Sequence, residues 1–365
     1  MENGLWADLL KDLCAVPGVS GHEDAISAEL GRRGRPYADE FYSDVVGNRF
    51  FVKKGCQPDF TVMLCAHMDE IGFMVCDITP NGFLYLVPIG YHDPRLLINQ
   101  TVTIHTQEKG EVTGVIGMAK PIHLLGVDEL QKPFTMQDIR VDVGAMSQNE
   151  AEALGIAPGD IVTFQRNGHV MNDKYFAAKA IDNRAGCAVM LEVLRRLQGE
   201  TIEPNLVAVG AVQEEIGFRG SIPASAAVKP DIGLAIDVTF AADDSQARFP
   251  QSTAILFGKG PAIQMVDWSP NHMSGNIVNP KLWRRLLAVA KENGIPAQYE
   301  VMMNGGTDAI AMHASGTGAV SGCISLPQRY MHSTVGYVCM EDLEASTQLI
   351  LAFLRSLKEK FPCNP

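Results

Sequence analysis

The sequence predicts an α/β protein with a small β-rich domain inserted into its first domain. Helical spacing alternates with apolar runs in residues 1–70 and again after residue 173. Between these parts, residues 71–167 show short alternating runs that are separated by turn signals. A chain of 365 residues is also too long for one compact core, so two domains are expected.

The first part of the chain is expected to contain two helices followed by two strands. Apolar side chains at helical spacing predict the helices over residues 5–15 and 23–33. Residues 48–52 predict a short strand, and residues 60–66 are continuously apolar, as in a strand buried on both faces. This second strand leads directly into His67.

The middle part predicts a small β-barrel or sandwich. Its strands are expected over residues 82–87, 101–105, 111–116, 140–143 and 160–164. One short helix is expected over residues 147–154.

The last part returns to the α/β pattern. Helices are expected over residues 183–197, 281–292 and 340–360. Strands are expected over residues 206–212, 231–236, 296–301 and 319–326.

The composition indicates a cytoplasmic globular protein. Hydrophobic residues make up 46% of the chain, but no apolar run approaches the roughly 20 residues that span a bilayer. Residues 1–10 show no secretory signal. The 8 cysteines are scattered without a CxxC pair, which argues against a disulfide framework and a thiolate zinc site. The net charge of −12 disfavours nucleic acid and anionic membranes as partners.

Side chains that can bind metal lie where predicted strands end. The ends of four strands are followed by His67, by Glu214 and Glu215, by Asp237 and by His332. Asp182 lies just before a predicted helix. Because open α/β sheets place their sites at the carboxyl ends of strands, these residues can converge although they are far apart in the sequence.

Two histidines and three carboxylates suit a pair of divalent ions such as zinc, cobalt or manganese. A single zinc needs only three of them, so five with one Glu to spare suggest two ions bridged by a carboxylate. Such a pair can activate a shared water and polarise the carbonyl that it attacks. The spare Glu would transfer the proton, and Asp69, two residues after His67, is placed to hold the other ring nitrogen.

Each of these residues also has a structural interpretation. Glu-Glu pairs are common on solvated turns, and an Asp at a strand end can cap the next segment. Most of the 9 histidines are expected to be surface or core residues. His92 and Asp93, in the middle part, have no strand-end partners and are interpreted as structural. The joint pattern predicts the metal centre.

Five ordered motifs resemble those of the M42 metallopeptidases, the tetrahedral-aminopeptidase family. That family also includes glutamyl aminopeptidases and proteins labelled endoglucanase M. The motifs are AHMDEIGF, KAIDNRAG, EEIGFRG, AIDVT and RYMHS, at residues 66–73, 179–186, 214–220, 235–239 and 329–333.

The resemblance implies a role for each site residue. One ion would be bound by His67 and Asp237 and the other by Glu215 and His332, with Asp182 bridging both. Glu214 would be the general base, and Asp69 would orient His67. Four departures from the family pattern leave these residues intact. They are Asn183 in place of a second Asp, Met302–Asn304 before the Gly pair, Ser333–Gly336 after the last His, and Tyr91-His92 in place of Gly-Trp.

The resemblance also implies an architecture and an assembly. A mixed-sheet, zinc-peptidase-like catalytic domain would span residues 1–70 and 168–365, and an inserted β-rich dimerisation domain would span residues 71–167. The protein would be a cytoplasmic aminopeptidase that acts on peptides and forms a homo-oligomer, up to a twelve-subunit tetrahedral shell.

Two other functions stay open at this point. A glycoside hydrolase of the endoglucanase type would use two carboxylates, but it would leave both histidines idle, and the chain has only 3 Trp for sugar stacking. A non-catalytic assembly protein would not need a complete set of ligands and a base.

Overall fold

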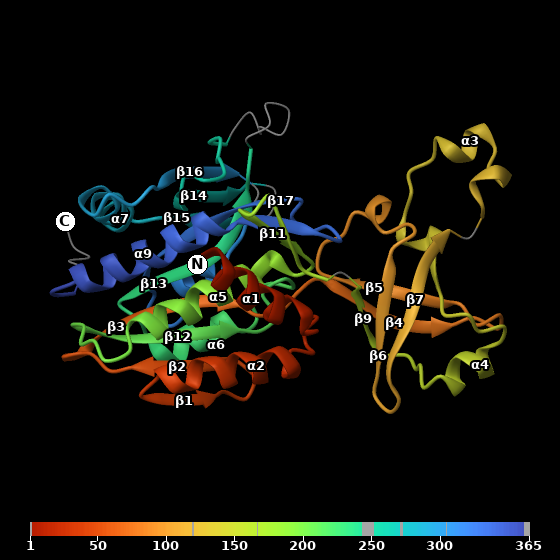
Figure 1. Cartoon of the computed structure of the whole chain (residues 1–365), viewed down its shortest axis with the longest axis horizontal. Helices are drawn as coiled ribbons and strands as arrows, with labels where there is room; N and C mark the ends of the chain where they lie inside the picture. Colours follow the sequence, from red (N-terminus) through yellow and green to blue (C-terminus); the bar gives the residue numbers. More distant parts are fainter. Residues whose placement is uncertain are drawn as a thin grey trace.

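The computed structural model describes residues 2–118, 120–165, 167–242, 252–270, 273–303 and 305–360. It consists of a twelve-stranded mixed sheet between helices and a closed barrel of six strands, which lie side by side along the long axis (Figure 1). The prediction of an α/β protein with an inserted β-barrel is therefore confirmed.

The large sheet has its parallel strands at the centre. Its strands follow the order β1-β2-β12-β3-β13-β17-β18-β11-β10, and β14 adds β15 and β16 beside β17. β12, β3, β13 and β17 run parallel to one another, so their carboxyl ends meet at one edge of the sheet. These four strands span Pro204–Ala211, Gln57–His67, Ile232–Phe240 and Val320–Arg329. The others are β1 Glu40–Ser43, β2 Arg49–Lys53, β10 His169–Met171, β11 Tyr175–Ala178, β14 Ala262–Ser269, β15 Ser274–Ile277, β16 Gln298–Met303 and β18 Gly336–Cys339.

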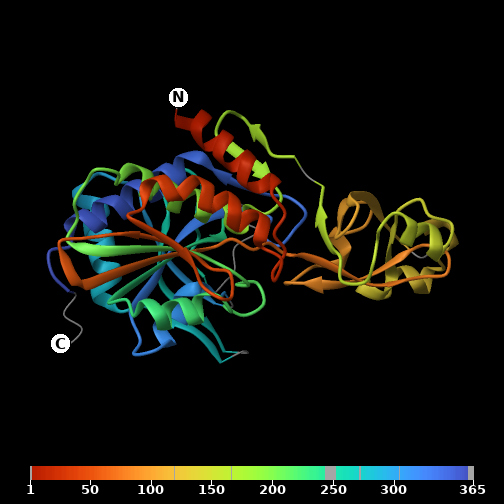
Figure 2. The same cartoon turned by 90° about the horizontal axis from the view of Figure 1, so that it is seen from below.

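Helices cover both faces of this sheet (Figure 2). One face carries α1 Glu2–Ala15, α2 Asp24–Gly34, α5 Ile181–Arg196, α7 Pro280–Glu292 and α9 Met340–Ser356. The other face carries α6 Ser221–Val228 and α8 Asp308–Ala314. The central strands are consequently buried on both sides, as the apolar run before His67 predicts.

The barrel closes in the order β4-β5-β8-β7-β6-β9, with every pair antiparallel. Its strands are β4 Gly72–Ile78, β5 Leu84–Ile89, β6 Thr101–Thr106, β7 Gly110–Met118, β8 Ile139–Asp142 and β9 Ile161–Phe164, and the helices α3 Val127–Leu130 and α4 Gln148–Ala153 lie in its loops. It has an apolar core of its own, built on alternate residues of these strands.

Two predicted boundaries are wrong, and one strand next to the site is missing from the prediction. β13 does not end before Asp237, because its pairing with β17 continues from Ile232 to Phe240, whereas its pairing with β3 stops at Ala235. α9 ends at Ser356 rather than at residue 360, since Leu357 is already extended. The strand β4, which starts five residues after His67, was not predicted at all.

Candidate metal centre

The predicted site residues converge at the carboxyl edge of the central strands. His67 is the last residue of β3, and Glu214 and Glu215 lie in the loop that follows β12. Asp237 lies inside β13, at the point where β3 no longer pairs with it. His332 lies in the loop after β17.

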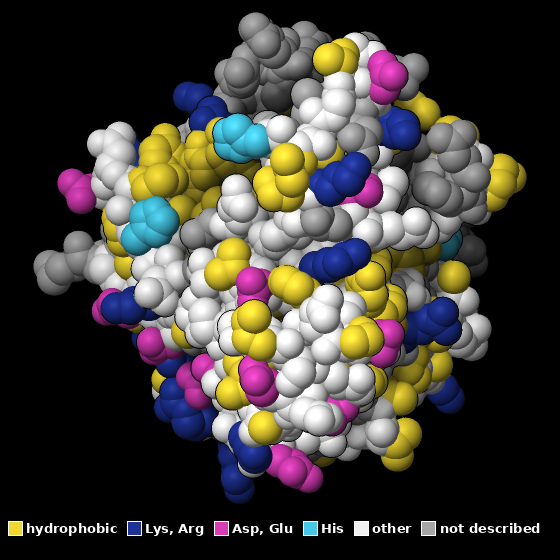
Figure 3. Space-filling view, turned by 90° about the vertical axis from the view of Figure 1, so that its right-hand side faces the viewer, with side chains coloured by type: hydrophobic (Ala, Val, Ile, Leu, Met, Phe, Trp, Pro, Cys, Tyr) yellow, Lys and Arg dark blue, Asp and Glu magenta, His cyan; other side chains and the backbone are white. Residues whose placement is uncertain are grey.

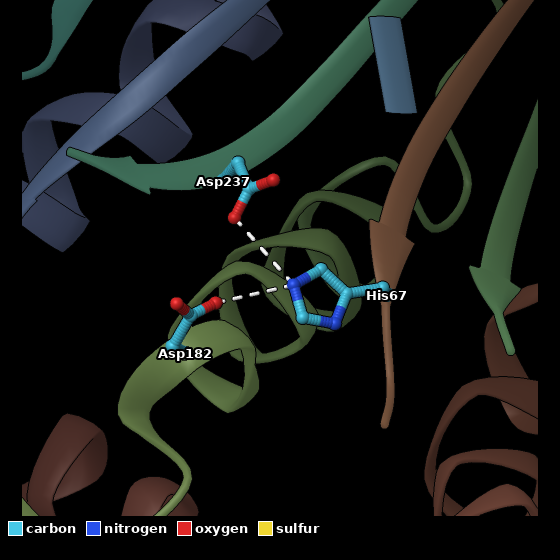
Figure 4. Close-up of side chains that lie close together, drawn as sticks. All are labelled: His67, Asp182 and Asp237. Atoms are coloured by element: carbon cyan, nitrogen blue, oxygen red, sulfur yellow. Dashed lines mark hydrogen bonds and ion pairs between the residues drawn. The ribbon is translucent and has the colours of Figure 1, made fainter. Parts of the chain in front are cut away.

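A first cluster forms around the ring of His67. Its Nε2 atom lies 3.1 Å from Asp182 Oδ1 and 3.6 Å from Asp237 Oδ1. Both carboxylates face the same ring nitrogen (Figure 4). The ligand atoms of the three residues all lie within 4.8 Å of one another, which is close enough for one ion to be bound by all three.

A second cluster shares Asp182 with the first. Nε2 of His332 lies 3.5 Å from Asp182 Oδ2 and 3.5 Å from Glu215 Oε2. The two oxygens of Asp182 therefore face different histidines, as a bridging carboxylate requires. All five predicted ligands are brought together in two groups of three.

The buried charges of these clusters fit divalent cations. Burial, and then the Asp182 carboxylate, raise the pKa of Glu215 well above its usual value. In the described part of the chain, Glu215 Oε1 has no hydrogen-bond partner. Burial alone would lower the pKa of His67, but the surrounding carboxylates, Glu214 first, raise it well above its usual range. Cations bound here would supply both the missing positive charge and the missing partner.

Asp69 lies behind His67, on the side away from the clusters. Its Oδ1 atom is 3.3 Å from His67 Nδ1, although the ring N–H is not aligned for a hydrogen bond. The backbone N–H groups of Glu214 and Glu215 donate to its two oxygens, and Ser20 Oγ donates to Oδ2 at 2.6 Å. Burial would raise the pKa of Asp69, but His67 and these hydrogen bonds lower it below its usual value. Asp69 thus stays ionised and connects His67 to the Glu214–Glu215 loop.

Glu214 is close to the centre without belonging to either cluster. Its Oε2 atom lies 3.9 Å from His67 Nε2, and the residue is 9% exposed. Burial raises the pKa of Glu214 well above its usual value, while His67 lowers it. One carboxylate of the Glu-Glu pair is thus a candidate ligand and the other is left over, as the sequence predicts.

Comparison with known proteins agrees with this arrangement. Residues 47–349 match the model of the M42 glutamyl aminopeptidase family. The chain belongs to this family. It is therefore an M42 metalloaminopeptidase, and the recognition of that family from its motifs is confirmed.

Relatives and solved structures cover nearly the whole chain. The lysyl aminopeptidase of Pyrococcus furiosus is 38% identical over 360 residues, which cover 96% of this chain and 97% of the relative. An aminopeptidase from the archaeon Desulfurococcus kamchatkensis superposes with a TM-score of 0.91 at 34% identity, covering 98% of this chain and 96% of that one. The Pyrococcus horikoshii TET1 peptidase, which can assemble into a tetrahedron or a large octahedral shell, superposes with a TM-score of 0.85 at 30% identity, covering 96% and 100%.

Asn183, one of the departures from the M42 pattern, holds the shared carboxylate in place. Asp182 and Asn183 have non-helical backbone angles at the start of α5. Nδ2 of Asn183 donates to the backbone carbonyl of Ile236 at 2.7 Å, and its Oδ1 accepts from the backbone N–H of Gly186 at 2.9 Å. The side chain thereby ties the segment that carries Asp182 to the strand that carries Asp237.

Two contacts at the site were missed from the sequence. Ser20 reaches Asp69 from 49 positions away. Glu70, next to Asp69, forms a buried ion pair with Lys179 Nζ at 2.8 Å from both of its oxygens. Neither contact has a local signal in the sequence, because each pair meets only when the chain folds.

His92 and Asp93 lie outside both clusters, as their structural interpretation requires. The ring of His92 is bonded to barrel backbone, and Asp93 pairs with Arg95 at the surface. Among the described helices, none has the length and apolar character needed to cross a membrane.

Proposed function

We propose that this M42 protein removes N-terminal residues from peptides with two divalent ions. One is bound by His67, Asp182 and Asp237, and the other by Asp182, Glu215 and His332. The position of Asp182 between two histidines carries the proposal. Ions held in this way would activate a water molecule and polarise the peptide carbonyl. Nitrogen and oxygen ligands admit zinc, cobalt and manganese.

Glu214 serves as the general base. Its carboxylate lies beside the His67 cluster but is not needed in it, so it is free to exchange protons. It takes a proton from the attacking water and delivers it to the nitrogen of the leaving amine.

Asp69 serves as the positioning residue for His67. Its Oδ1 atom faces Nδ1 at 3.3 Å, and its pKa is lowered below the usual value. A proton held on Nδ1 leaves the lone pair of Nε2 directed towards Asp182 and Asp237.

The segment that follows Asp237 is the candidate wall for the N-terminal side chain of the substrate. Thr239, Ala242, Glu300 and Met302 lie together there, around a hollow with space for about one water molecule. Thr239 lies two residues after Asp237, so both side chains project from the same face of β13. A side chain bound there would lie next to a peptide carbonyl held at the centre.

The architecture supports self-assembly through the barrel. We assign residues 1–70 and 168–365 to catalysis and residues 71–167 to dimerisation. Figure 3 looks onto the barrel end of the molecule, where hydrophobic side chains lie between charged ones on the surface. Large apolar residues exposed on this part include Val87, Leu96, Val115, Leu124, Val127 and Met146. A tetrahedral dodecamer built from such dimers is the assembly that we propose.

The convergence of histidines with carboxylates favours a peptidase over a glycoside hydrolase. A glycosidase places two carboxyl groups on either side of a sugar bond and has no use for His67 and His332. Here both histidines contact carboxylates at the centre of the site.

The test is hydrolysis of aminoacyl-p-nitroanilides, with carboxymethyl-cellulose assayed in parallel. The protein is first stripped with EDTA and then refilled separately with zinc, cobalt or manganese. Amide turnover that returns only with metal is the expected result. Release of reducing sugar without amide turnover would support the glycosidase instead, and full metal binding without any turnover would support a non-catalytic protein.

A further inference from the structure

His332 is the least enclosed of the five candidate ligands. Its side chain is 28% exposed, whereas the other four are between 1% and 14% exposed. It also lies in a loop and has a φ of 53°, a conformation that residues other than Gly rarely adopt. A side chain in this position needs an external contact to fix the direction of its ring.

That contact comes from the inserted barrel. The Nδ1 atom of His332 lies 3.0 Å from the backbone carbonyl oxygen of Tyr91, in the loop that follows β5. This is the one hydrogen bond of the His332 ring within the described ranges. A carbonyl can only accept, so Nδ1 must carry the proton. The lone pair of Nε2 is then directed towards Asp182 and Glu215, which is the tautomer that a metal ligand needs.

The next residue, His92, fixes the position of this carbonyl. Its Nε2 atom lies 2.9 Å from the carbonyl oxygen of Gly72 and 3.0 Å from that of Ile89, at the ends of β4 and β5 nearest the large sheet. One N–H therefore connects both strands, because a carbonyl cannot donate. The ring also stacks on Phe73 with centroids 4.3 Å apart. A loop held in this way cannot move the Tyr91 carbonyl without breaking contacts of the barrel.

We propose that the barrel completes the second ion site. The Tyr91 carbonyl positions His332, and His92 is the side chain that holds this carbonyl in place. The inference rests on the proposed function in one respect, since His332 must bind metal. It predicts that loosening the barrel loop lowers the affinity for the ion bound by Asp182, Glu215 and His332. The affinity for the ion next to His67 should not change.

The variant His92→Phe tests this prediction. Phe keeps a ring that can stack on Phe73 but removes the N–H that both carbonyls share. The metal-stripped protein is titrated with zinc in an isothermal titration calorimeter. The affinity for one ion should be about 10- to 100-fold lower than in the wild type, and the affinity for the other should be unchanged. A second variant, Tyr91→Gly, loosens the same carbonyl without touching the barrel core, since Tyr91 is 79% exposed. It should show the same selective loss even if His92→Phe does not fold.

A matched control lies in the same barrel. The Nε2 atom of His105 bonds Thr163 Oγ1 at 2.9 Å, away from both clusters. His105→Phe should therefore leave both affinities unchanged. In a His332→Ala background, His92→Phe should have no further effect on the remaining ion.

Two results would overturn the inference while leaving the proposed function intact. One is that His92→Phe lowers the affinity for both ions equally. The other is that both affinities are unchanged in the His92→Phe protein and in the Tyr91→Gly protein. A wild-type protein that binds fewer than two ions would instead contradict the proposed function.

Discussion

The side chain of Asn183 donates to the backbone carbonyl of Ile236 at 2.7 Å, and this bond joins the two segments that carry Asp182 and Asp237. Asn183 is fully buried, so its loss would remove two buried hydrogen bonds, one to the carbonyl of Ile236 and one from the N–H of Gly186. We expect Asn183→Ala to lower the free energy of unfolding by about 1–3 kcal/mol. Urea denaturation measures this, and an unchanged midpoint would show that the bond does not stabilise the fold.

Asp69 should control metal affinity rather than stability alone. Asp69→Asn keeps the shape of the side chain but removes the charge that faces His67 Nδ1. We expect at least one ion to bind about 10- to 100-fold more weakly, as is typical when the partner of a ligating histidine is lost. Equilibrium dialysis against zinc is the measurement. Asp12→Asn, at the surface and paired with Arg33, is the control that should bind normally.

Asp342 should make stability depend on pH. Burial raises the pKa of Asp342 from 3.8 to about 6, although the N–H groups of Gly258 and Gly260 donate to it. Between pH 3.8 and about pH 6, Asp342 keeps its proton in the folded protein but releases it in the unfolded chain. The free energy of unfolding should therefore fall as pH rises from about 4 to about 6.

The comparison variant is Asp342→Asn, which cannot titrate in this range. The stability of the metal-free wild type should fall relative to that of the variant as pH rises, by at most about 1.4 kcal/mol per pH unit. Parallel pH profiles of the two proteins would show that Asp342 has no raised pKa.

The sequence predicts the candidate site better than the boundaries of the elements around it. His67 could be placed because the apolar run before it has to be a buried strand. Asp237 was wrongly placed at a strand end because the length of β13 depends on its pairing with β17, which extends from Ile232↔Val320 to Phe240↔Gln328, between residues far apart in the chain. The contacts of Ser20 with Asp69 and of Tyr91 with His332 are of the same kind. Each contact joins segments that are distant in the sequence, so no local sequence pattern predicts it.

The most direct test of the two-ion mechanism is the kcat of Glu214→Gln. Gln has the same shape but cannot take a proton, so kcat on the best aminoacyl-p-nitroanilide should fall about 10²- to 10⁴-fold. Metal analysis of the same sample should still find two ions per chain, because Glu214 belongs to neither ligand cluster. Near-normal turnover with both ions bound would contradict the account, since the proton would then be transferred by another group.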